Sequence, residues 1–151
     1  LRYLTMFIKH GLSELWVRYG KGEKRRLIPL HVLLKKLEPQ LCNVLVKAHI
    51  LTGDDEMSKI GTKLGALTAE PTKYLKEFGE LHQEDDSDQV ERYLVRVWKP
   101  SSTSDTFDEL HYREYRRSIS LPDLPTTSHS VRGHILRASY LIRRCLSVLD
   151  N

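Results

Sequence analysis

The sequence has 151 residues, of which 40% are hydrophobic and 29% charged, a composition typical of a globular protein that argues against a disordered or fibrous one. Lys and Arg number 24 against 20 Asp and Glu, so the formal net charge of +4 permits a polyanionic partner without requiring one. No apolar run reaches the roughly 18 residues that a membrane span needs, and we expect no membrane partner.

The chain is expected to open with strands. The nearly continuous apolar run over residues 1–8 is typical of a strand buried on both faces in a parallel sheet, and Leu15 to Tyr19 is a second strand candidate. A glycine-rich turn and the basic cluster Lys24-Arg25-Arg26 follow. Together with Lys21, this cluster fits either a contact with a nucleic-acid backbone or a weak nuclear signal, and a solvent-facing turn is the commoner explanation.

Helices are expected over most of the remaining chain. Pro29 fits the first position of one helix, and Pro39 fits the start of another that ends near His49 to Thr52. Both cysteines and both tryptophans lie within apolar patterns, which predicts core packing and a reduced, intracellular protein. Further helices are predicted over 72–78, 90–98, 107–117, where Thr106 and Glu109 form a capping box, and about 130–149, which has a single apolar stripe.

The stretch from Leu51 to Ala66 holds the residue types most suited to chemistry. The carboxylates Asp54, Asp55 and Glu56 follow a buried element, and carboxylate oxygens are ligands that Mg²⁺ prefers. Gly61 then predicts a tight turn before a helix, where backbone N–H groups together with Lys59 and Lys63 could bind a phosphate. The simpler alternatives are a solvated acidic helix start and a plain turn between helices.

The same stretch resembles a known superfamily. Its Gly-x-Asp, short helix and Gly-x-Lys are similar to the end of the nuclease core and the helix-two-turn-helix of flap endonucleases. A closer resemblance is to PIN-like proteins of animal genomes, often linked to mobile elements, with the hallmark His-Ala-Leu-Thr-Gly-Cys-Asp-Thr-Thr-Ser. The matching residues here are His49 to Ser58, with shorter matches at Leu15 to Val17, Arg26 to His31, Leu124 to Thr127 and His134 to Tyr140.

The resemblance implies a helix-rich α/β fold. Residues 1–56 would be the C-terminal half of a nuclease core, with a small, mainly parallel sheet remnant, and 57–151 a helical portion with a helix-two-turn-helix-like turn; together they would form one partial PIN-like domain. Asp55 keeps the family's carboxylate and would be the principal Mg²⁺ or Mn²⁺ ligand. Asp54 and Glu56 replace a Cys and a Thr of the hallmark and could assist.

Three functions follow from this resemblance. The family's Asp-Thr-Asp would fall before Leu1, so the fragment would have half a metal site, whereas hydrolysis of a phosphodiester uses two metal ions about 4 Å apart. We therefore expect a nucleic-acid-binding fragment, with DNA favoured over RNA and the nucleus as one intracellular location, which cuts only when completed. The alternatives are a catalytically decayed interaction or scaffold module, and a nucleic-acid binder that needs no metal.

Overall fold

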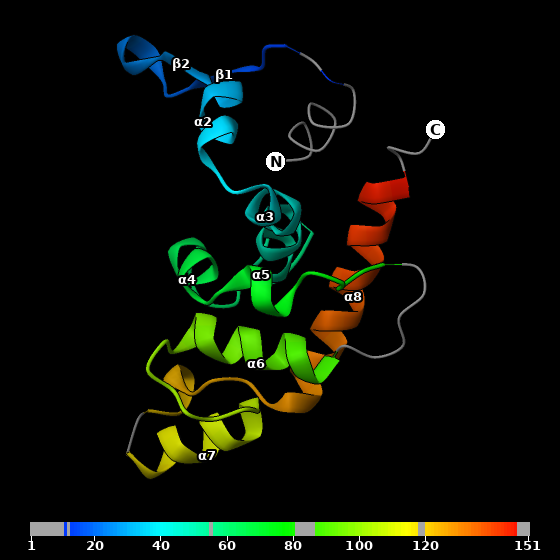
Figure 1. Cartoon of the computed structure of the whole chain (residues 1–151). Helices are drawn as coiled ribbons and strands as arrows, with labels where there is room; N and C mark the ends of the chain where they lie inside the picture. Colours follow the sequence, from blue (N-terminus) through cyan, green and yellow to red (C-terminus); the bar gives the residue numbers. More distant parts are fainter. Residues whose placement is uncertain (1–10, 12, 55, 81–86, 118–119, 148–151) are drawn as a thin grey trace.

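The computed structural model describes residues 11, 13–54, 56–80, 87–117 and 120–147. A hairpin and a short helix form one end of the molecule, and the remaining helices pack together beyond them (Figure 1). The prediction of a helix-rich α/β fold is confirmed. The elements are β1 (Trp16–Tyr19), η1 (Gly22–Lys24), β2 (Arg26–Pro29), α2 (Leu30–Lys36), α3 (Pro39–Leu51), α4 (Lys63–Thr68), α5 (Pro71–Tyr74), α6 (Ser87–Trp98), α7 (Phe107–Arg116), η2 (Leu121–Asp123) and α8 (Ser128–Ser147).

The two described strands pair antiparallel, with Trp16 opposite Pro29 and Tyr19 opposite Arg26. The expected parallel arrangement is not seen between them, because a tight turn can join antiparallel strands but not parallel ones. This turn requires Gly20, whose φ is +93° and where a Cβ would lie 2.4 Å from the Lys24 carbonyl oxygen. The strand predicted over residues 1–8 lies outside the described residues.

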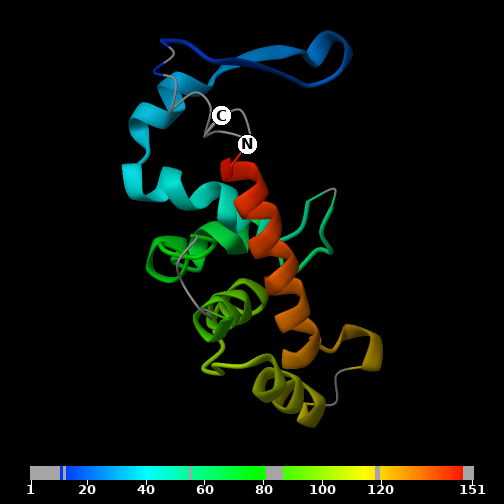
Figure 2. The same ribbon diagram turned by 90° about the vertical axis from the view of Figure 1, so that its right-hand side faces the viewer.

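The core is built mainly by α3, α6 and α8. Figure 2 shows α8 running along the helical body, and it packs against both α3 and α6. The apolar stripe predicted for the last helix is confirmed, since its residues Val131, Ile135, Ala138 and Ile142 are buried. One continuous cluster of buried hydrophobic side chains includes residues from both predicted portions, 1–56 and 57–151. The members of this cluster in α8 are Val131, Ile135, Ala138, Leu141 and Ile142.

Most predicted helices in the described chain are present, and Thr106 caps α7 as expected by accepting a hydrogen bond from the Glu109 N–H at 3.2 Å. The helix predicted over 72–78 is only one turn, α5. Its apolar residues Leu75 and Phe78 are nevertheless buried, because the following turns place them in the core. No described helix is both long and apolar enough to span a bilayer.

The prediction that both tryptophans lie in the core is wrong. Trp16 is 51% exposed on the hairpin, where it meets the His31 ring edge-on at 5.3 Å. Trp98 is 39% exposed at the end of α6 and contacts the Phe107 ring. For Trp16 the reason is that the hairpin has no second layer covering it among the described residues, and Trp98 lies at the very end of its helix.

Candidate functional site

The predicted site begins where α3 ends. The Thr52 N–H and hydroxyl both donate to the Ala48 carbonyl, at 3.1 and 2.8 Å, and the Gly53 N–H donates to the Ile50 carbonyl at 3.0 Å. Gly53 has a φ of +95°, the left-handed region in which glycine commonly terminates a helix. The Thr-Gly pair of the motif is therefore a helix stop that turns the chain into the acidic loop.

The Lys63 side chain caps the C-terminal end of α3. Its ammonium donates to the His49 carbonyl at 2.8 Å, to the Thr52 hydroxyl at 3.1 Å and to the Gly53 carbonyl. Cations are favourable at a helix C-terminus, where carbonyls lack intrahelical partners. Desolvation lowers the pKa of Lys63 below 10.5, an effect that Asp54 opposes. All three donors of the ammonium have partners within the protein, and its binding of a phosphate stays a prediction.

His134 joins α8 to the same helix end. Its Nε2 lies 2.8 Å from the Leu51 carbonyl oxygen and the side chain is buried, so Nε2 bears the donated proton. Desolvation lowers the pKa of His134 below 6.5, although the hydrogen bond to Leu51 partly opposes this. The histidine acts here as a buried, neutral connection between two core helices.

The lowered pKa of His134 predicts a loss of stability in mild acid. Below pH 6.5 the unfolded chain binds a proton that the folded protein resists, so this contribution is present above pH 6.5 and is lost as the pH falls towards the folded pKa. His134→Gln keeps a donor for Leu51 and does not titrate, so its free energy of unfolding should vary less between pH 7.5 and 5. Urea denaturation across this range measures the effect, with exposed His129→Gln on the same helix as control. Equal pH dependence in all three proteins would contradict the prediction.

The acidic loop is held by contacts within the chain. The Oδ1 atom of Asp54 accepts a hydrogen bond from the Glu56 N–H at 2.9 Å, and the Glu56 carboxylate forms an ion pair with Arg144 of α8 at 3.0 Å. Asp55, the predicted principal ligand, lies outside the described residues. No group of three or more His, Cys, Asp or Glu side chains in the described part of the chain is arranged to hold a metal ion. The described carboxylates by themselves therefore do not fit a complete Mg²⁺ or Mn²⁺ site.

The Gly61 turn is shaped by close packing against α6. The φ of Gly61 is +65°, and a Cβ there would lie 2.6 Å from the Val97 Cγ1 and 2.9 Å from the Val97 carbonyl oxygen. Thr62 then caps α4 by accepting from the Gly65 N–H at 2.9 Å. The predicted turn before a helix is present, but the close packing against α6 is sufficient to explain why a glycine is needed there. Of the three predicted phosphate-binding residues, Lys59 and Lys63 are exposed, and among the described residues only the Lys63 side chain makes hydrogen bonds.

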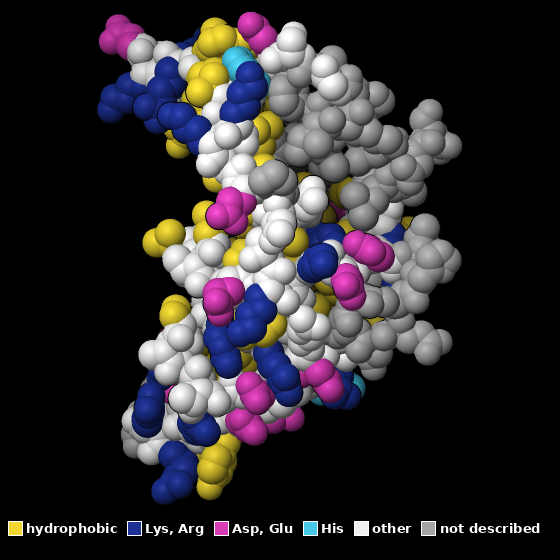
Figure 3. Space-filling model, in the orientation of Figure 1, with side chains coloured by type: hydrophobic (Ala, Val, Ile, Leu, Met, Phe, Trp, Pro, Cys, Tyr) yellow, Lys and Arg dark blue, Asp and Glu magenta, His cyan; other side chains and the backbone are white. Residues whose placement is uncertain are grey.

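The hairpin lies outside the predicted site, although it is strongly basic. Residues 16–29 contain five basic side chains and one acidic side chain, a net charge of +4 that equals the formal charge of the whole chain. Figure 3 shows these side chains gathered at the hairpin end of the molecule, and all five are exposed. The high density of positive charge within this short segment is visible in the sequence itself. The basic residues are Arg18, Lys21, Lys24, Arg25 and Arg26.

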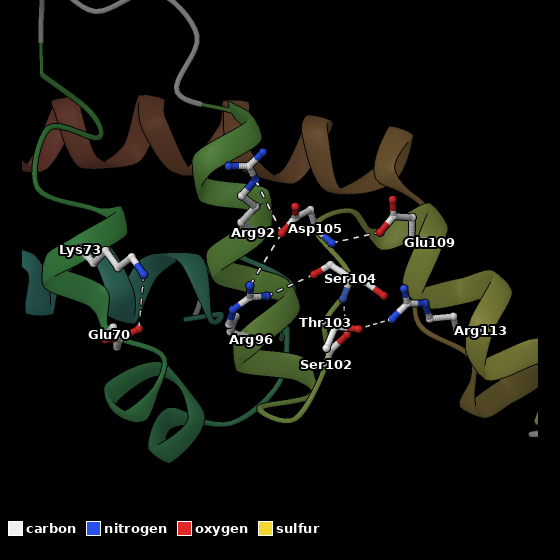
Figure 4. A network of polar contacts seen from close by, with 10 residues as sticks. All are labelled: Glu70, Lys73, Arg92, Arg96, Ser102, Thr103, Ser104, Asp105, Glu109 and Arg113. Carbon is white, nitrogen blue, oxygen red and sulfur yellow. Dashed lines mark hydrogen bonds and ion pairs between the residues drawn. The ribbon is translucent and has the colours of Figure 1, made fainter.

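Basic residues in the helical body are arranged differently. Arg92 and Arg96 both face Asp105, at 3.9 and 3.7 Å, and Lys73 lies 3.8 Å from Glu70 (Figure 4). Among the described residues, none of the five hairpin cations has an acidic partner within 4 Å. Arg26 makes a cation–π contact instead, with its guanidinium 5.5 Å from the centroid of the Tyr19 ring. Several cations of the helical body are thus paired with carboxylates, whereas the five hairpin cations are not, among the described residues.

A hollow of about 380 Å³ lies between the acidic loop and α8. Its exposed wall is formed by Leu136 and Tyr140, one helical turn apart and 71% and 65% exposed. Its lining is mostly apolar, with Glu56 and Arg137 contributing charge. This surface was not anticipated from the sequence, because the predicted stripe concerned only the buried face of α8.

The comparisons with known proteins add no relative to this picture: no family model, no curated protein and no solved structure matches the chain.

Proposed function

We propose that this chain is a nucleic-acid-binding module of the PIN-like nuclease kind, and that it contacts its ligand through the β1–β2 hairpin. The observation that supports this is the +4 charge of residues 16–29, which equals the net charge of the entire chain. Positive side chains that neutralise phosphates release condensed counterions, which drives binding at low salt. Because the five cations have no acidic partners among the described residues, binding would break no ion pair.

The site predicted from sequence supports binding less directly. Lys63 is engaged by three acceptors at the end of α3, and Gly61 is packed against α6. Lys59 and Lys63 are both exposed here, and only the Lys63 ammonium makes hydrogen bonds among the described residues. The turn formed by Lys59, Gly61 and Lys63 is therefore proposed as a secondary contact with the nucleic acid, and the hairpin as the principal one.

The experiment measures fluorescence anisotropy of a labelled 20-base-pair DNA at a series of salt concentrations. The triple variant with Lys21, Lys24 and Arg25 each changed to Glu reverses three charges at the hairpin tip. We expect binding to weaken at least about 100-fold at low salt, and the slope of log K against log salt to fall by about 1 for each lost phosphate contact. Circular dichroism checks that the fold is retained.

A matched control reverses three exposed cations of the helical body, so that the net charge of the two variants is the same. The control should bind DNA much more tightly than the hairpin variant. Equal weakening in both would show that only net charge matters and would contradict the hairpin as the contact. A large loss in Lys59→Glu alone would move the contact to the Gly61 turn. The control positions are Lys76, Arg116 and Arg143.

Metal-dependent hydrolysis belongs to this proposal only on the condition that further acidic residues complete the metal site. Asp54, Asp55 and Glu56 would contribute oxygen ligands for Mg²⁺ or Mn²⁺, and such a cation would supply Lewis-acid stabilisation of a phosphodiester oxygen. In the structure Glu56 is paired with Arg144, so it would have to leave that partner to bind a cation. Further acidic residues from outside this sequence would be required, and we propose no turnover for the chain alone.

The second candidate is an interaction or scaffold module, and the hollow beside α8 favours it. Leu136 and Tyr140 leave apolar surface open to solvent next to Arg137, which suits a partner with an apolar side chain near a carboxylate. This candidate differs from the first in its salt dependence. An apolar contact on α8 would persist at salt concentrations that release a nucleic acid from the hairpin.

A further inference from the structure

We infer that the ligand of the hairpin is double-helical B-form DNA, with the β1–β2 ribbon entering its major groove. This inference rests on the proposed function and adds the class of nucleic acid to it. It depends on how charge is distributed over the two faces and the tip of the ribbon.

Directly opposed residues of an antiparallel pair share a face, and faces alternate along each strand. Arg18 pairs with Leu27 and therefore lies on one face, whereas Arg26 pairs with Tyr19 and lies on the other. The three remaining cations are in the turn at the tip. A flat surface that receives a single strand presents its cations on one side. A ribbon with cations on both faces and at its tip is suited to a site where phosphates flank it on both sides.

The two sides of a duplex groove provide this arrangement of phosphates. The major groove of B-DNA is about 12 Å wide and admits a two-stranded ribbon, whose strands lie about 4.8 Å apart. The major groove of A-form RNA is deep and narrow, and side chains do not reach its base edges. The geometry of the ribbon therefore favours a DNA duplex over an RNA duplex of the same sequence.

The hairpin also leaves one apolar side chain near its tip available for base edges. Leu27, paired with Arg18 near the tip, is 63% exposed, whereas Trp16 lies at the base of the ribbon against His31. Apolar side chains contact the thymine methyl group, which is displayed only in the major groove. The ribbon is joined to the body at its base, where the Leu30 N–H donates to the Leu15 carbonyl at 2.8 Å, so its tip projects away from the helices (Figure 1).

The test compares three labelled 20-mers of one sequence: a DNA duplex, an RNA duplex and a DNA single strand. Anisotropy titrations should give at least about tenfold tighter binding to the DNA duplex than to either other ligand. Arg18→Glu and Arg26→Glu, on opposite faces, should each lower the magnitude of the salt slope for the duplex by about 1. Arg116→Glu on α7 is the control for charge and should leave the slope unchanged.

The outcomes separate this inference from the proposed function. If the single strand or the RNA duplex binds as tightly as the DNA duplex, the groove inference is overturned while nucleic-acid binding stands. If only one of the two faces affects the slope, the ribbon lies flat on its ligand and the inference is also overturned. If none of the three ligands binds at low salt, the proposed function itself fails.

Discussion

Gly53→Ala is expected to lower the free energy of unfolding by about 3 kcal/mol or more. The φ of +95° is unfavourable for any residue with a Cβ, at a cost of about 1–3 kcal/mol. The added Cβ would lie 2.6 Å from the Lys59 Cα and 2.9 Å from the Ser58 carbonyl oxygen, which are backbone atoms that cannot rotate away. Overpacking of this kind costs a further 1–3 kcal/mol, roughly. Urea denaturation followed by circular dichroism measures the loss.

Gly133→Ala is the matched control. Gly133 lies within α8, and a Cβ there would meet nothing closer than the flexible Arg137 guanidinium at 3.7 Å. Alanine is favoured over glycine inside a helix by about 0.5–1 kcal/mol, so this variant should be slightly more stable than the parent. If the two substitutions changed stability by similar amounts, the role assigned to Gly53 as a required helix stop would be wrong.

Glu91→Ala is expected to lower the free energy of unfolding by about 3 kcal/mol. Glu91 is buried in α6, and its Oε1 atom accepts from the Phe107 N–H at 2.7 Å and from the Ser128 hydroxyl at 2.5 Å. One carboxylate therefore receives the first N–H of α7 and the hydroxyl that begins α8. Truncation leaves two donors without this acceptor, at about 1–3 kcal/mol for each group that stays buried, and also creates a cavity.

Two further variants define what Glu91 contributes. Glu91→Gln keeps an oxygen acceptor of nearly the same shape, so its loss should be at least about 1 kcal/mol smaller than that of Glu91→Ala. Glu38→Ala removes an exposed carboxylate that makes no capping hydrogen bond, and its effect should stay within about 0.5 kcal/mol. A Glu91→Ala variant as stable as Glu38→Ala would show that the two helix starts are held by other contacts.

Much of the helical framework could be predicted from the sequence. The Thr106 cap of α7, the proline at the start of α3 and the buried stripe of α8 all follow from local rules of hydrogen bonding and helical period. The charge of the hairpin was also present in the sequence, since counting charge over residues 16–29 requires no coordinates. Local rules worked at these places because the interactions involved lie within a few residues of one another.

The candidate site was less accessible to such reasoning. Lys63 follows a glycine turn, which suggested a phosphate ligand, but the fold brings its ammonium to the end of α3. Glu56 pairs with Arg144, which is 88 positions later in the chain. Neither partner can be identified from spacing, because each depends on how α8 and α4 dock against α3.

The sequence by itself determined most helix starts, the apolar face of the last helix and where positive charge is concentrated. Only the tertiary structure decided which polar side chains are engaged in hydrogen bonds within the protein. His134 bonds to the Leu51 carbonyl, Lys63 to the end of α3, and Glu91 to the first residues of two helices. The physical reason is that a buried donor or acceptor must find a partner wherever the packing of helices places one, whereas the charges of an exposed hairpin need none.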